Sequence, residues 1–441
     1  MISVSNILKV TTAMTILLSR PQFFARAFTR TLSTAFLSNS HTYYPSTSFV
    51  SEISVPSQRL INTSSSQSSS RLQFSSSEFE LSPPAKNLQG DVIKPKKGQR
   101  IVSFGDVHGD LIALSKFLKT ARVMDDDFNW CGGESLLVQV GDVLDRGDHE
   151  LACFYLLCKL SRQASEAGGG VILLHGNHEA LNAMGLFQYA FPEGNAEFEE
   201  IVGKGVDSYF ENQRWRIQFA GNQPCRWAAF EPGGLLAEPL LSQMKVAVTV
   251  GHSVFVHAGL TATHIRDMGG IEGMNKAARD WILTVHHGNN RNDGDFSSVE
   301  EILNYADERA KLATAAMPAC LGGGIGSPSP VWMRDYSQPS DAAPKNPKAQ
   351  LMINAALESL QGDVQRMVMG HTPQDKINAA LNGKAWRIDV GASRGVASGL
   401  PEVLEIIHEG GEKGEDLINI LTLSGERVPS EERQILDVKL I

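Results

Sequence analysis

IVSFGDVHG, at residues 101–109, is the first of three stretches in which a short apolar run leads into a polar loop. The second is LLVQVGDVLDRG at 136–147, and the third is VILLHGNHE at 171–179. Each apolar run has the length and the branched residues of a buried strand. The segments between the runs, 111–118 and 151–160, carry apolar residues at helical spacing. This alternation predicts a right-handed βαβαβ unit with a parallel sheet, whose polar loops share the carboxyl edge where α/β sheets bind ligands.

The second half of the chain predicts further strands that end in polar residues. Residues 245–257 have the pattern of a hairpin with its turn at Gly251 and His257 at its end. His371 follows another predicted strand, at 365–369. The remaining expected elements are helices near 298–315 and 348–360, and strands at 384–390, 402–408 and 416–423.

Composition bounds the class of protein. The 441 residues carry a net charge of −9, but residues 1–77 contribute about +5, so the remainder is near −14. An acidic body argues against binding to nucleic acid, which depends on neutralising phosphates. The five cysteines form no Cys-x-x-Cys pair, which indicates reduced thiols inside the cell. No run of about 18 apolar residues is present, so no membrane span is expected.

The chain divides into segments of different composition. Residues 1–77 are rich in serine and threonine and nearly free of acids, with arginines among phenylalanines, which is typical of an organellar transit peptide. Composition alone leaves chloroplast and mitochondrion open. We expect a linker at 78–99, a catalytic domain at 100–425 with a helical insertion at about 181–240, and a C-terminal tail at 426–441.

The side chains that follow the predicted strands combine carboxylate, imidazole and amide donors. Asp106 and His108 are two residues apart, so in an extended segment they point the same way and can chelate one ion. Asp142 begins the next loop and can offer a carboxylate that bridges two ions. The neutral donors come from three further loops: Asn177, His257 and His371. Without thiolate, this set suits manganese, with iron or zinc as alternatives.

The neighbouring residues suit phosphoryl transfer. Two metal ions about 3.5–4 Å apart can hold a hydroxide and clamp a phosphoryl group that undergoes in-line displacement. Arg146 and Arg334 are forks suited to phosphate oxygens. His178 can protonate the leaving oxygen, with Asp145 fixing its tautomer. Each motif alone is ordinary turn chemistry, but their order after successive strands predicts a two-metal phosphoesterase.

The motifs GDVHG, GDVLDRG and GNHE, followed by HAGL at 257–260 and GH at 370–371, resemble those of the phosphoprotein phosphatase family of metallophosphoesterases. The resemblance spans about residues 100–410. It implies the calcineurin-like metallophosphoesterase fold, an α/β fold in which helices flank a central β-sandwich and the metal site lies at the carboxyl ends of strands. It also implies two ligand sets that share Asp142, the first with Asp106 and His108, the second with Asn177, His257 and His371. By the same resemblance Asp145 and His178 form the acid pair and Arg146 contacts phosphate, whereas the context of Arg334 departs from the family pattern.

Departures from the family pattern indicate a subgroup. Ala258 replaces a glycine that eukaryotic members usually show, and DVGA at 389–392 is similar to bacterial members. With the leader, these features resemble the Shewanella-like protein phosphatases of the plant chloroplast type, which implies a chloroplast location. The expected activity is hydrolysis of phosphoserine and phosphothreonine in proteins.

Other activities remain as alternatives. A tyrosine-directed protein phosphatase and a bis(5′-nucleosyl)-tetraphosphatase-like hydrolase are both compatible with the motifs. A nuclease is disfavoured, because Pro373 stands where Gly-His-x-His would place its second histidine. A non-catalytic scaffold is expected to have lost a ligand, and none is lost. The sequence does not indicate an oligomeric state.

Overall fold

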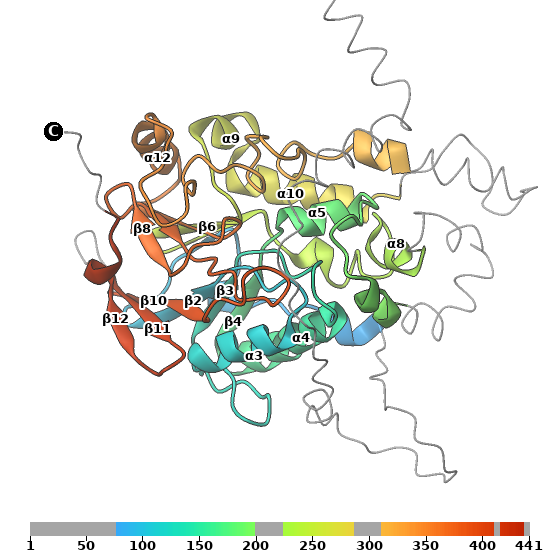
Figure 1. Cartoon of the computed structure of the whole chain (residues 1–441), viewed down its shortest axis with the longest axis horizontal. Helices are drawn as coiled ribbons and strands as arrows, with labels where there is room; N and C mark the ends of the chain where they lie inside the picture. The colour runs from blue at the N-terminus through green and yellow to red at the C-terminus, as the bar shows by residue number, and fades with distance from the viewer. Residues whose placement is uncertain (1–75, 199–223, 286–309, 410–414, 436–441) are drawn as a thin grey trace, which may run out of the picture. The chain divides into compact units, whose positions relative to one another are not determined.

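The computed structural model describes residues 76–198, 224–285, 310–409 and 415–435 (Figure 1). The expected leader lies almost wholly outside these ranges. So do part of the expected insertion at 181–240, most of the helix expected near 298–315, and the end of the expected tail.

The predicted parallel unit is present. Strands β2 (Gln99–Phe104), β3 (Leu136–Gln139) and β4 (Gly170–Leu173) are parallel neighbours in that order. Helices α3 (Leu111–Thr120) and α4 (Glu150–Glu166) connect them and bury the apolar faces predicted from their spacing. Three antiparallel strands continue the sheet beyond β2 to give the order β12-β11-β10-β2-β3-β4: β10 (Glu402–His408), β11 (Leu417–Thr422) and β12 (Arg427–Pro429).

A second six-stranded sheet has the order β1-β5-β6-β7-β9-β8. The predicted hairpin is confirmed as β5 (Ala247–Val250) and β6 (Ser253–Val256), with Gly251 at φ 57° in the turn. Strand β7 is parallel to β6, so His257 and His371 emerge at the same edge. The other strands are β1 (Val92–Ile93), β7 (Arg366–Met369), β8 (Asn378–Ala380), which was not predicted, and β9 (Ala385–Arg387).

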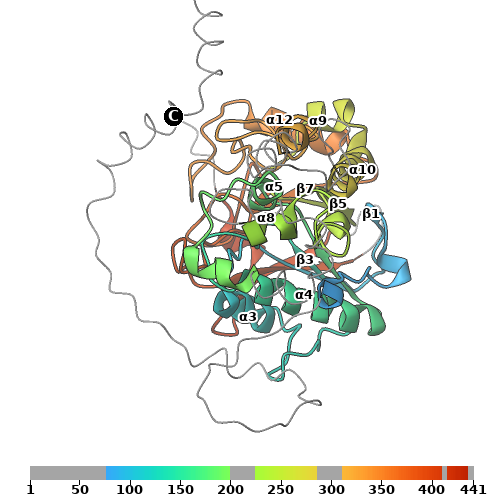
Figure 2. The same ribbon diagram turned by 90° about the vertical axis from the view of Figure 1, so that its right-hand side faces the viewer.

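The two sheets lie between layers of helix, as Figure 2 shows. Helices α3 and α4 cover the sheet that contains β3, and α9 (Ala262–Asp267), α10 (Gly270–Leu283) and α12 (Ala349–Glu358) cover the other. The expected β-sandwich flanked by helices is therefore confirmed. The remaining elements are α5 (Asn177–Ala183), α8 (Pro224–Phe230) and short 3-10 helices at Ser76–Phe79, Lys86–Leu88, Pro192–Gly194, Leu241–Gln243 and Ser430–Arg433.

The edges of the folded unit differ from the expectation. Residues 78–99 were expected to be a linker, but Phe79 and Leu88 are fully buried and β1 pairs with β5. The prolines and lysines of this segment suggested a linker, while its few apolar residues pack on the body. Residues 426–441 were expected to be a tail, yet β12 pairs with β11.

An ion-pair cluster joins the two sheets at the end of β6 and β7 away from His257 and His371. Asp416 accepts a hydrogen bond from Arg366 and lies 2.9 Å from His408 Nδ1 and 3.2 Å from His252 Nδ1. Its side chain is 1% exposed.

Among the described residues, none of the helices combines the length and the apolar character that crossing a bilayer requires.

Candidate active site

The six predicted metal-ligand residues converge at the carboxyl ends of β2, β3, β4, β6 and β7. The parallel pairing within each sheet places these strand ends side by side, so residues far apart in the sequence meet. All six are buried, from 0% to 5% exposed: Asp106, His108, Asp142, Asn177, His257 and His371. The structure therefore brings together every ligand that the sequence predicted.

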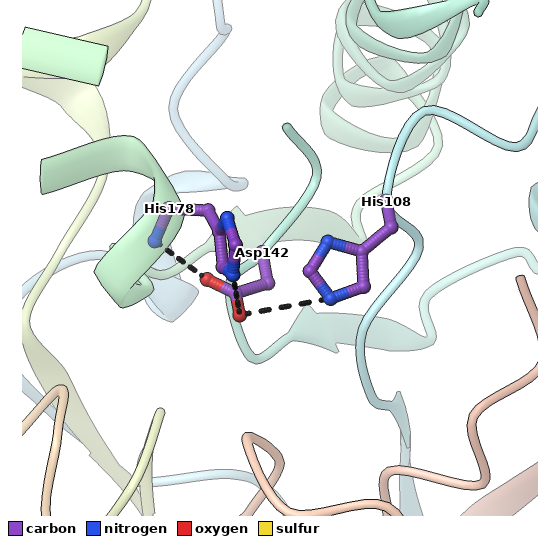
Figure 3. Close-up of side chains that lie close together, drawn as sticks. All are labelled: His108, Asp142 and His178. Atoms are coloured by element: carbon purple, nitrogen blue, oxygen red, sulfur yellow. Dashed lines mark hydrogen bonds and ion pairs between the residues drawn. The ribbon is translucent and has the colours of Figure 1, made fainter. Parts of the chain in front are cut away.

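Asp142 lies at the centre of these donors. Its Oδ2 is 3.3 Å from His257 Nε2 and 3.9 Å from His108 Nε2. Two groups of possible ligands share it, and within each the ligand atoms lie within 4.8 Å of one another: His108, Asp142 and His178, and Asp142, His257 and His371. Figure 3 shows the imidazoles of His108 and His178 both facing one oxygen of the Asp142 carboxylate. A carboxylate common to two donor groups is in the position of a bridging ligand.

Backbone carbonyls orient two of the imidazoles. His108 Nδ1 is 2.9 Å from the Leu144 carbonyl oxygen, and His257 Nδ1 is 2.8 Å from that of Val140. With Nδ1–H donated to these carbonyls, each Nε2 carries the free lone pair. Such outer contacts fix the tautomer and the ring direction that a metal ligand needs. The Nε2 of His257 also lies 3.1 Å from Asn177 Oδ1.

The charges in the site fit a cationic occupant. Burial, together with the carboxylates of Asp389 and Asp142, raises the pKa of Asp106 well above its usual range. Burial would raise the pKa of Asp142 too, but the imidazoles of His257 and His178 hold it well below. Burial and the neighbouring His178 lower the pKa of His108 to about 3, so its imidazole is neutral. Burial would lower the pKa of His257, but the Asp142 carboxylate raises it above its usual value. Buried carboxylates that lie among imidazole nitrogens suit divalent cations, which offset this negative charge.

His178 and Asp145 form the predicted pair. His178 Nδ1 is 2.6 Å from Asp145 Oδ2, and both side chains are buried. The backbone N–H of His178 donates to Asp142 Oδ1, and its Nε2 is 3.9 Å from Asp142 Oδ2. The ring thus faces the donor cluster through Nε2 while a carboxylate holds its other nitrogen. This arrangement suits proton donation, and the same imidazole also lies among the possible metal ligands with His108 and Asp142.

Both predicted arginines line one cavity of about 180 Å³ with the donors. Arg146 Nη2 is 3.3 Å from His178 Nε2. Arg334 Nη1 donates to Thr372 Oγ1 at 2.7 Å. The other residues that line the cavity are Asp106, His108, Asp142, Asn177, His178, His371, Tyr189, Ile325, Trp332 and Pro373. Asp145 and His257 are not among the lining residues.

Several residues that build the site were not assigned roles from the sequence. Glu179 accepts the backbone N–H groups of Asp142 at 2.9 Å, Val143 at 2.8 Å and Gly176 at 2.7 Å, and so holds two ligand loops together. It belongs to the GNHE motif, which was a signal for its importance. Tyr189, whose ring centroid is 5.1 Å from that of His178, carried no signal in the sequence.

Five residues of the site have a left-handed backbone, which is unusual for a residue with a side chain. The φ angles are 49° at His108, 57° at Asp142, 69° at Asp145, 67° at Arg146 and 67° at His371. Such conformations cost free energy and persist where the surrounding structure imposes them, commonly at functional sites. Here they occur in the loops that follow β2, β3 and β7, at the carboxyl ends of these strands.

Comparison with known proteins agrees with this fold and site. Residues 99–313 match the family of calcineurin-like phosphoesterases. Shewanella-like protein phosphatase 2 of Arabidopsis thaliana is 37% identical over 353 residues, which cover 75% of this chain and 81% of that protein. Shewanella-like protein phosphatase 1 of Plasmodium berghei is 32% identical over 162 residues, 36% of this chain and 39% of that protein. The cold-active protein-tyrosine phosphatase of a psychrophilic Shewanella has a similar structure, with a TM-score of 0.52, 20% identity, and coverage of 78% and 83%.

The fold and the donor set define a metallophosphoesterase, a hydrolase of phosphate esters. The chain belongs to the Shewanella-like protein phosphatases, within the calcineurin-like phosphoesterases. The family predicted from the motifs is thereby confirmed.

Proposed function

We propose that this phosphatase hydrolyses phosphoserine and phosphothreonine in proteins, with two divalent cations shared by Asp142. The observation that carries the proposal is the His178–Asp145 pair facing the Asp142-centred donors. The first cation would be held by Asp106, His108 and Asp142. The second would be held by Asp142, Asn177, His257 and His371. When bound, the cations would supply an activated water and polarise the phosphate; manganese is the expected ion.

The chain's own residues then orient the phosphate and assist the leaving group. Arg146 and Arg334 reach into the cavity, where their guanidinium groups would bind the non-bridging phosphate oxygens. His178 would give its Nε2 proton to the departing oxygen, while Asp145 holds Nδ1 and stabilises the charged ring. An alkoxide leaving group needs such a proton more than a phenolate does. A dedicated acid pair therefore supports serine and threonine esters as substrates.

One observation favours a second candidate, a tyrosine-directed phosphatase. The Tyr189 ring is 37% exposed at the rim of the cavity, against His178 and 5.7 Å from the guanidinium carbon of Arg146. A partly exposed aromatic ring of this kind can stack on the ring of a phosphotyrosine. The related Shewanella structure is also that of a protein-tyrosine phosphatase.

A phosphopeptide panel decides between the candidates. With manganese-loaded enzyme, we expect kcat/KM for phosphoserine and phosphothreonine peptides to exceed that for the matched phosphotyrosine peptide, and that for diadenosine tetraphosphate, by at least about 10-fold. The Asp142→Asn variant, prepared in parallel, measures any contaminating phosphatase. Faster turnover of the phosphotyrosine peptide than of the phosphoserine and phosphothreonine peptides would favour the Tyr189 interpretation instead.

We further propose that residues 1–75 direct import into the chloroplast, with the mitochondrion as the alternative destination. These residues are polar, rich in serine and low in acids, so their composition cannot assemble a core. A chain that begins at Ser76 is expected to keep full activity, measured on p-nitrophenyl phosphate. A fluorescent protein carrying residues 1–75 is expected to enter the organelle in plant cells. If that fusion stays in the cytosol, the leader is not a transit peptide.

A further inference from the structure

Arg226 is a fully buried cation that reaches the acid pair from outside the recognised motifs. It lies on α8, within the predicted insertion, and α8 packs against α5, which carries His178. Arg226 Nη2 donates to Asp145 Oδ1 at 2.8 Å. Its two Nη atoms also donate to the Glu150 carboxylate, at 2.5 and 2.6 Å.

Aromatic rings hold the Arg226 guanidinium in place. Its central carbon lies 4.9 Å from the ring centroid of Phe198, 5.6 Å from that of Phe187 and 5.9 Å from that of Phe230. The Arg226 Nε–H donates to Asn182 Oδ1 at 2.6 Å. Stacking and a planar fork pre-organise the group, and burial strengthens its interactions with charges. Arg226 is therefore held in one orientation.

The two oxygens of Asp145 divide their contacts between Arg226 and His178. Oδ1 accepts from Arg226 and, at 3.0 Å, from Asn182, while Oδ2 is 2.6 Å from His178 Nδ1. Burial alone would raise the pKa of Asp145, but the hydrogen bond of His178 and the charge of Arg226 hold it below its usual range. A buried carboxylate without a paired cation is costly and tends to rotate or become neutral.

Glu150 contacts both Arg226 and the backbone of Asp145. It is fully buried, and its Oε1 accepts the backbone N–H of Asp145 at 2.5 Å. Arg226 therefore contacts the Asp145 side chain directly and the Asp145 backbone through Glu150. Side chain and backbone of one residue are held by a single guanidinium.

We propose that Arg226 is a positioning residue for the phosphatase reaction, which fixes Asp145 so that its Oδ2 holds His178 Nδ1 with Nε2 facing the substrate. The insertion that carries α8 then has a role in the acid step, in addition to any role in shaping the cleft. This inference rests on the proposed acid role of His178. It predicts that loss of Arg226 acts through His178, and therefore depends on the leaving group.

The test compares Arg226→Met with wild type on a phosphoserine peptide and on p-nitrophenyl phosphate, with the metal content of each preparation measured. We expect kcat on the phosphopeptide to fall roughly 10- to 100-fold with little change in KM, as for other outer contacts of a catalytic group. The loss on p-nitrophenyl phosphate is expected to be smaller, since p-nitrophenolate leaves without a proton. In a His178→Asn background, Arg226→Met is expected to cost little more, because residues that act as a unit are not additive.

Two further variants separate positioning from folding. Arg226→Lys keeps the charge without the fork, so it is expected to restore part of kcat, and it decides the question if Arg226→Met does not fold. Arg366→Met removes a matched buried cation, paired with Asp416 at the other end of the strands. It is expected to lower the melting temperature with equal effects on both substrates.

Three results would overturn the inference. Equal losses on the two substrates for both Arg226 variants would mean a structural role only. Full additivity with His178→Asn would mean that Arg226 does not act through the imidazole. If His178→Asn itself showed no leaving-group dependence, the proposed acid would be wrong, and the role of Arg226 would fall with it. Because His178→Asn is measured alone, these failures are distinguishable.

Discussion

Asp142→Asn is expected to lose phosphatase activity by on the order of 10³-fold or more while the protein stays folded. The substitution removes the one charge that both donor groups share, and metal stabilisation of a transition state is worth several kcal/mol, at about 1.36 kcal/mol per tenfold in rate. The amide oxygen of asparagine can still accept the backbone N–H of His178, so the loop keeps that contact. Metal analysis, thermal melting and turnover on p-nitrophenyl phosphate measure the three effects separately.

Asp416→Asn is the matched control for this experiment. It also removes a buried carboxylate with two histidine neighbours, but in the cluster at the far end of β6 and β7. It is expected to lower the melting temperature, because Arg366 loses its charged partner, and to keep both metals and activity. Near-normal turnover of Asp142→Asn with two retained metals would contradict the bridging role.

His178→Asn is expected to keep both metals and to lose on the order of 10²–10⁴ in rate on a phosphoserine peptide. The alkoxide of serine needs a proton as it leaves, whereas p-nitrophenolate is stable without one. The loss on p-nitrophenyl phosphate should therefore be clearly smaller. Steady-state kinetics on both substrates and metal analysis of the same preparation provide the measurement.

Two companion variants sharpen the result for His178. Asp145→Asn is expected to show the same leaving-group dependence, because its effect passes through the imidazole. Arg146→Ala is expected to lower kcat/KM for both substrates alike, since both present the same phosphate oxygens. Loss of a metal from His178→Asn would instead make His178 a ligand, a role that its place beside His108 and Asp142 also permits.

The parts of the fold that were predictable are those where local pattern and chemistry coincide. The strands β2, β3 and β4 are continuous apolar runs that end in polar loops, and buried parallel strands produce that pattern. His257 and His371 were identifiable because each follows an apolar run, and parallel pairing of β6 with β7 brings them together. Each of these residues lies at the end of a strand, and the strands beside it are also recognisable in the sequence.

The parts that were missed depend on contacts without a local pattern. Arg226 lies in an insertion with no strand alternation, and its partner Asp145 is 81 positions away. Phe79 and Leu88 are isolated apolar residues among prolines and polar residues, so their burial against the body left no periodic signal. Only the three-dimensional arrangement shows that these side chains have partners.

At the site residues with a left-handed backbone, catalysis and thermostability favour different amino acids. At Arg146, where φ is 67°, glycine would adopt the same conformation at lower cost, and the side chain is only half-buried. Selection for heat resistance alone would favour discarding this phosphate-facing arginine, whereas selection for turnover retains it. Engineering of a hardier enzyme should therefore leave these five positions untouched and seek its gains on surfaces far from the cavity.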